Sequence, residues 1–132
     1  MKIRFMKFAI AVVLISTFVF GSVYAEQPMP RADEVFSSAY AYIYSNKNLK
    51  ISCVTYDPHN IRITSCWYEV KVNGDWDYGA AISLNPSSVS NSLILGAEKN
   101  CASYFGTGTY RVGFTVDADG HSITRYSNER TY

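Results

Sequence analysis

The segment ITSCWYEVKVNGDWDY, residues 63–78, contains the longest uninterrupted two-residue alternation in the chain. Successive side chains of an extended strand point to opposite faces. Cys66 and Tyr68 should therefore share one face with the two valines that follow them, while Trp67 and Glu69 share the other. This alternation predicts a strand in a β-sheet.

A turn signal follows the alternation at once. Asn73-Gly74 suits the two positive φ angles of a type I′ turn, which joins the strands of a tight hairpin. The segment therefore predicts a β-hairpin whose returning strand carries Trp76 and Tyr78.

The first 25 residues have the pattern of a signal peptide. Residues 1–7 contain three basic side chains and no acid, and residues 8–20 are mainly apolar. That run is shorter than the roughly 20 residues that a membrane-spanning helix needs. Small or modest side chains at 23–25 fit the recognition site of a signal peptidase. We predict cleavage after Ala25; an uncleaved amino-terminal anchor is the alternative.

Charge and length limit the class of protein. Three of the 12 Lys+Arg residues lie in the leader, which leaves 9 against 11 Asp+Glu. Such a chain lacks the basic surface that would attract nucleic acids or anionic membranes. We therefore expect no nucleic-acid partner and no membrane insertion after cleavage. The remaining length suits a single domain, with 26–37 as an exposed lead-in and 38–132 as the folded part.

Short alternating segments continue on both sides of the hairpin. Residues 38–45 place three tyrosines on one face, and 49–56 predict a second strand before a turn at 57–60. The later expectations are a polar loop at 85–92, an apolar run at 93–95 ended by Gly96, strands at 101–105 and 108–116, a turn at 117–120 and a strand at 121–126. Strands separated by turns about every ten residues predict an all-β, antiparallel β-sandwich of about seven strands.

Three of these segments carry a family resemblance. LKISC at 49–53, ITSCWYEV at 63–70 and GTYRV at 108–112 resemble, in order, three strands of fibronectin type III and immunoglobulin-like domains. The hairpin YEVKVNGDW and the ending TYRVGFTVDADGHSITRYS are also similar to small secreted bacterial proteins of unassigned function. The resemblance implies an immunoglobulin-like sandwich in which Tyr110 is a buried corner residue. It implies no particular function.

The three cysteines depart from that family pattern. Cys53 stands at the family's tryptophan position and Cys66 at a tyrosine position. The alternation turns Cys53 and Cys66 into the core from facing sheets, so we predict that they form a disulfide and leave one thiol unpaired. A Cys53–Cys101 bridge is the rival. The remaining alternative is that all three are buried as small hydrophobic residues.

Residues for catalysis or metal binding are sparse. His59 and His121 fall in or beside predicted turns, which disfavours a Cys-His catalytic site. The sequence DADG at 117–120 begins like a calcium loop but lacks its later ligands, so a tight turn is the better interpretation. Asp75 and Asp77 are most simply solubilising. We predict no catalytic residue, no metal and no cofactor.

Aromatic residues are the remaining feature. Trp67, Trp76 and Tyr78 would form a contact surface if they are exposed together, because such rings supply large contact area at small entropic cost. Alternatively, the tyrosine strand at 38–45 covers them. We expect a secreted or cell-surface, non-enzymatic binding or structural module whose partner is an extracellular or cell-envelope protein or glycan. A bacteriocin-like or toxin-like antagonist and a small enzyme are the alternatives.

Overall fold

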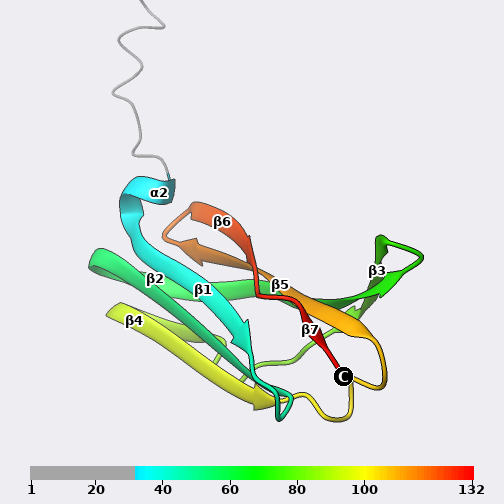
Figure 1. Ribbon diagram of the computed structural model, residues 1–132. Helices are drawn as coiled ribbons and strands as arrows, with labels where there is room; N and C mark the ends of the chain where they lie inside the picture. The colour runs from blue at the N-terminus through cyan, green and yellow to red at the C-terminus, as the bar shows by residue number, and fades with distance from the viewer. Residues whose placement is uncertain (1–31) are drawn as a thin grey trace, which may run out of the picture. The chain divides into compact units, whose positions relative to one another are not determined.

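The computed structural model describes residues 32–132 (Figure 1). The predicted signal peptide and the lead-in up to residue 31 lie outside the described residues. The described part is all-β apart from one helical turn. Its elements are α2 (Ala32–Val35), β1 (Phe36–Ile43), β2 (Asn48–Val72), β3 (Asp75–Ala81), β4 (Ser88–Asn100), β5 (Thr109–Ala118), β6 (His121–Tyr126) and β7 (Arg130–Thr131).

The long strand β2 organises the sheet. Its first half pairs with β1 on one side and β4 on the other, and its second half pairs with β3 and β5. β6 and β7 then pair with β5, and every pairing is antiparallel. Because its two ends have different neighbours, β2 belongs to both halves of one curled sheet (Figure 1). This seven-stranded arrangement is compatible with the predicted β-sandwich.

The predicted turn at 57–60 is wrong, because these residues continue β2 where it passes between the two halves. The pairing with β4 changes register on both sides of His59. Asn60 donates its backbone N–H to the Asp119 carboxylate at 3.2 Å and accepts a bond from the Asp119 N–H at 3.3 Å. These bonds to the β5–β6 turn satisfy backbone groups that a local turn would otherwise pair. Turn-forming residues thus produce an irregular, extended bend.

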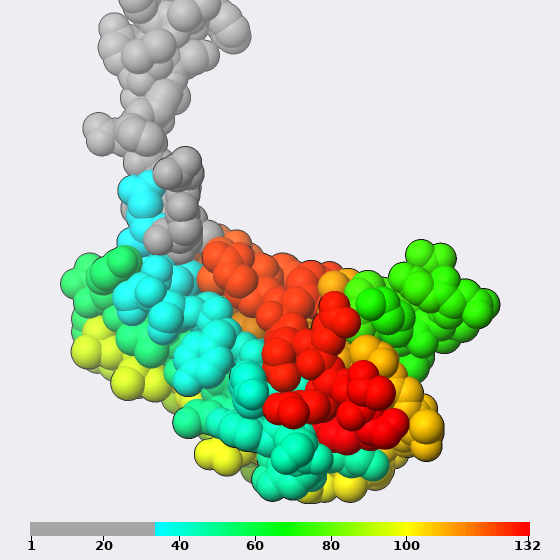
Figure 2. Space-filling model, in the orientation of Figure 1, coloured from blue at the N-terminus to red at the C-terminus, as the bar shows by residue number. Residues whose placement is uncertain are grey.

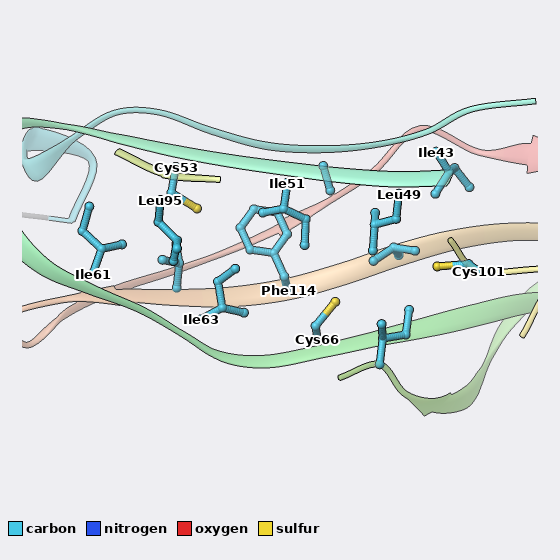
Figure 3. Packing of buried hydrophobic residues seen from close by; sticks show 14 of the residues in the cluster. Ile43, Leu49, Ile51, Cys53, Ile61, Ile63, Cys66, Leu95, Cys101 and Phe114 are labelled. Atoms are coloured by element: carbon cyan, nitrogen blue, oxygen red, sulfur yellow. The ribbon is translucent and has the colours of Figure 1, made fainter. Parts of the chain in front are cut away.

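The core lies between the two halves and follows the predicted alternation. Figure 3 shows its side chains meeting from ribbons on opposite sides. Leu49, Ile51 and Cys53 of β2 are fully buried, and so are Val112 and Phe114 of β5. Both strands therefore face the core with the side that the sequence predicted.

Tyr110 is buried, as predicted, and lies in an aromatic cluster with Phe105 and Tyr132. Its hydroxyl accepts a hydrogen bond from the Gly106 N–H at 3.0 Å, and its O–H donates one to the Thr107 carbonyl at 3.5 Å. The polar end of a buried aromatic side chain is thereby satisfied within its own loop.

Two chain segments differ from their predicted conformation. The segment 101–105 is a turn rather than a strand, since the backbone N–H groups of Tyr104 and Phe105 both donate to the Cys101 carbonyl. Gly96 does not end a strand, because β4 runs through it and also takes in part of the predicted loop at 85–92.

The start of the domain also differs from the prediction. Val35 and Phe36 are buried, so the predicted exposed lead-in is wrong for these residues, and β1 begins two positions earlier than expected. The alternation within β1 is as predicted. Ile43 is buried, while Tyr40 and Tyr42 are exposed.

Cys53, Cys66 and Cys101 are free and buried, so the predicted disulfide is wrong. Figure 3 shows Cys53 and Cys101 toward opposite ends of the core, with Phe114 between Cys53 and Cys66. Burial raises the pKa of Cys53 and Cys66 to about 12 and that of Cys101 to about 11. The thiols therefore pack as small apolar side chains, the alternative left open above.

The central hairpin is confirmed. Val72 pairs with Asp75 across Asn73 and Gly74, whose φ angles are 53° and 87°. Figure 2 shows this hairpin, in green, projecting from the rest of the domain. Both φ angles are positive, as a type I′ turn requires.

The buried thiols predict a specific reactivity. In the native protein at neutral pH, a thiol reagent should modify the cysteines only slowly, because reaction needs the thiolate and access to it. After denaturation without a reductant, three thiols should titrate. Fewer than three would mean that a disulfide forms after all.

The hairpin turn at Gly74 and the buried Tyr110 should differ in their contribution to stability. In Gly74→Val the new Cβ meets no atom within 4 Å, so only backbone strain of about 1–3 kcal/mol is expected. Tyr110→Ala empties a buried aromatic volume and should cost about 3–5 kcal/mol. Chemical denaturation followed by circular dichroism gives both values. A Tyr110→Ala variant as stable as wild type would contradict its place in the core.

Candidate binding surface

The outward face of the sheet half formed by β3, the end of β2, β5 and β6 collects the predicted aromatic residues. The register pairs Trp76 with Lys71, Tyr78 with Glu69, and Trp67 with Gly113, which in turn pairs with Tyr126. Trp67, Trp76 and Tyr78 are thus brought onto one face. We call the set Trp67, Glu69, Trp76, Tyr78, Arg111 and Tyr126 the aromatic surface.

Glu69 holds two members of this surface with separate oxygens. The Trp67 indole N–H donates to Glu69 Oε2 at 2.8 Å. Arg111 Nε donates to Glu69 Oε1 at 2.8 Å, and Arg111 Nη2 lies 2.7 Å from the same oxygen. The Glu69 side chain is only 13% exposed, so this ion pair is less screened by water than an ordinary surface pair.

The Arg111 guanidinium lies against two rings. Its central carbon is 4.5 Å from the centroid of the Trp76 ring and 4.2 Å from that of Tyr126. A planar cation in this position is attracted by the electron-rich ring faces. Arg111 therefore links β3 to β6 across the sheet, and Glu69 fixes its orientation.

Gly113 makes the close approach of Trp67 possible. A Cβ atom at this position would lie 2.5 Å from Trp67 and 2.9 Å from Tyr126. The two rings stand nearly perpendicular, at 88°, with their centroids 6.1 Å apart. A side chain at Gly113 would push both rings away from β5. An isolated glycine inside a strand often marks such a close approach.

The aromatic surface is ordered by packing but remains accessible. Tyr78 is 66% exposed and Tyr126 is 46% exposed, while Trp67 and Trp76 are half-buried. The tyrosine strand β1, which was the alternative cover, pairs instead with the first half of β2. That alternative is wrong.

Sequence reasoning missed Arg111, Tyr126 and Gly113. Arg111 alternates with the core residues Tyr110 and Val112, so its outward direction could be predicted. Its partner could not be predicted, because Arg111 lies opposite Glu69 only in the observed register between β2 and β5. The strand glycine was the available signal for a close contact.

His59 and the DADG segment have structural partners. His59 Nδ1 lies 2.9 Å from Asp119 Oδ2. This hydrogen bond is the largest cause of a lowered pKa at Asp119, and the hydrogen bond from the Asn60 N–H is the second. Asp117 accepts hydrogen bonds from Gly120 N at 3.2 Å and Ser122 Oγ at 2.9 Å, which closes the tight turn. Over the described residues, His, Cys, Asp and Glu side chains form no group of three able to hold a metal.

Comparison of the chain with known protein families and with curated protein sequences found no match. Within residues 32–132, no helix is long and apolar enough to cross a membrane.

The contact at Gly113 predicts a difference between two glycines. Gly113→Ala should displace Trp67 and Tyr126 and cost about 1–3 kcal/mol through overpacking. Gly96→Ala in β4 is the matched control, because its new Cβ would meet only the Ile51 carbonyl, at 4.0 Å. It should change stability by less than about 1 kcal/mol.

Denaturant unfolding monitored by tryptophan fluorescence measures both variants. Only Gly113→Ala should also shift the native emission, since it moves an indole. Equal effects of the two substitutions would contradict the described contact.

Proposed function

We propose that this chain is a secreted, non-enzymatic β-sandwich module of the fibronectin type III/immunoglobulin-like kind, which binds an extracellular or cell-envelope partner through the aromatic surface. The observation that carries the proposal is the aromatic surface itself: exposed rings held in place by Arg111 and Glu69.

The strand arrangement supports the fold assignment. β1, the first half of β2 and β4 lie in one half of the curled sheet, and β3, the second half of β2, β5 and β6 lie in the other. Two antiparallel groups packed over a common core are the architecture of immunoglobulin-like domains.

Tyr110 supports the same assignment. It lies near the start of β5, and its hydroxyl bonds back to the backbone of Gly106 and Thr107 just upstream. This is the geometry of the tyrosine corner, a feature of many immunoglobulin-like sandwiches.

The composition of the aromatic surface supports binding. Trp, Tyr and Arg are the residue types that most often dominate the energy of protein interfaces. Here Trp67 and Arg111 are fixed by Glu69 before any partner arrives. A preordered surface loses less conformational entropy on binding than mobile side chains do. The signal-peptide pattern of residues 1–25 supports the extracellular location.

A retention experiment tests this function. The purified protein is immobilised and exposed to cell-envelope extract, and the retained material is compared between variants. Tyr78→Ala and Tyr126→Ala should each weaken retention, with Tyr126→Ala reducing affinity at least about tenfold, or 1.4 kcal/mol. Tyr40→Ala and Tyr56→Ala are the controls, because both tyrosines are exposed and lie outside the aromatic surface.

Circular dichroism should show all four variants folded. Equal retention by all four variants would place the binding elsewhere. No retention by the wild-type protein would contradict the proposal that it binds an envelope component.

A further inference from the structure

The aromatic surface continues along the same sheet face into a row of hydroxyl groups. Two residues along the strands from Trp67 and Tyr126, the outward positions form what we call the hydroxyl row: Ser65, Thr115 and Thr124. Ser65 pairs with Thr115, which in turn pairs with Thr124, and the two threonine Oγ1 atoms lie 2.8 Å apart. Ser65 and Thr124 are exposed. Groups that can donate and accept hydrogen bonds therefore lie directly beside the rings.

Trp67 and Tyr78 offer ring surface to a ligand. Tyr78 is 66% exposed. Trp67 is half-buried, and its indole N–H is already bonded to Glu69, so the ring itself is what remains for a partner. The face of an aromatic ring carries partial negative charge and attracts the weakly positive hydrogens of C–H bonds.

Arg111 adds hydrogen-bond donors between the rings. A guanidinium group has five N–H bonds. Glu69 Oε1 accepts from Nε and lies close to Nη2, and the remaining N–H groups have no acceptor within residues 32–132. The Arg111 side chain is 26% exposed, so these donors can reach a ligand.

The charges of this face are compensated within the protein. Arg111 is paired with Glu69. At the border of the surface, Lys71 Nζ lies 3.5 Å from Glu129 Oε1. Because electrostatic complementarity guides recognition, a face without net charge fits an uncharged partner better than an acidic or basic one.

The outward positions of this sheet half carry no aliphatic side chain larger than alanine. In the described strands they are aromatic, charged or hydroxyl-bearing, apart from glycine and alanine. A protein partner normally buries a core of apolar side chains. A sugar ring instead presents C–H bonds and hydroxyl groups side by side, which is the combination that aromatic rings and the hydroxyl row can match.

We propose that the partner of the aromatic surface is an uncharged polysaccharide. Its sugar rings stack on Trp67 and Tyr78, and its hydroxyl groups bond to Arg111 and the hydroxyl row. The inference rests on the proposed binding function and names the chemistry of its ligand. Tyr78 of β3 and Thr124 of β6 are three strand spacings apart, or about 14 Å, so several linked sugar units are needed to cover the face.

Co-sedimentation with insoluble cell envelope tests the inference. The envelope is used intact and after boiling in detergent and digestion with protease, which leaves polysaccharide. The wild-type protein should sediment with both preparations. Its retention on the stripped material should change by less than about twofold between about 50 and about 500 mM NaCl, because salt screens only interactions between charges.

A matched pair of threonine variants tests the hydroxyl row. Thr124→Val nearly preserves the shape of the side chain and removes one hydroxyl group, so it should weaken binding to the stripped envelope about threefold or more. Thr107→Val is the control, because Thr107 is exposed but lies in the loop before β5, outside both sets of residues. It should bind like wild type, and circular dichroism should show both variants folded.

The outcomes separate the ligand from the function. Sedimentation with intact but not with stripped envelope would make the partner a protein, which overturns this inference and leaves the proposed binding function standing. Sedimentation with neither preparation would contradict the proposed function and the inference with it. Binding to stripped envelope that is lost at high salt, or that Thr124→Val leaves unchanged, would also overturn the assignment of an uncharged polysaccharide.

Discussion

β2 pairs with four other strands, and both halves of the curled sheet are built on it. A strand this long can serve two halves only if it changes direction, and the change occurs around His59 and Asn60. The backbone there departs from regular pairing, so its polar groups need other partners. Asp119 supplies them from the β5–β6 turn, with Oδ2 accepting from both His59 Nδ1 and Asn60 N. The bend and that turn therefore depend on each other.

The aromatic surface follows from the same arrangement. The second half of β2 turns Trp67 and Glu69 outward, and β5 brings Arg111 and Gly113 beside them. One carboxylate then satisfies an indole N–H and a guanidinium. Loss of Glu69 would leave a partly buried cation without its counter-charge, which usually costs more than the pair itself contributes. Rigidity of the surface thus rests on a single acidic residue.

Local alternation was enough to predict the faces of the main strands. Leu49, Ile51 and Cys53 face the core because a strand repeats every two residues, and Asn73-Gly74 specifies its turn by backbone geometry alone. The residues at 57–60 could not be interpreted this way, since turn-forming residues also occur at irregular bends within a strand. The hydrogen bonds that favour a bend within the strand over a turn come from Asp119, which is distant in sequence.

Other features depended on long-range geometry in the same way. Cysteine pairing could not be predicted, because Cys53 and Cys66 face the same core but Phe114 lies between them. The role of Arg111 depended on the register of β5. The pairings of β2 with β4 and β5, such as Ile61 with Ala118, join residues far apart along the chain, whereas its pairings with β1 and β3 are local hairpins. Folding should therefore be slow, on the order of milliseconds to seconds, and cooperative, because neither half has a complete set of strands without β2. If the chain is exported as proposed, it would still be unfolded when it passes through the translocation machinery. The domain would then fold after export.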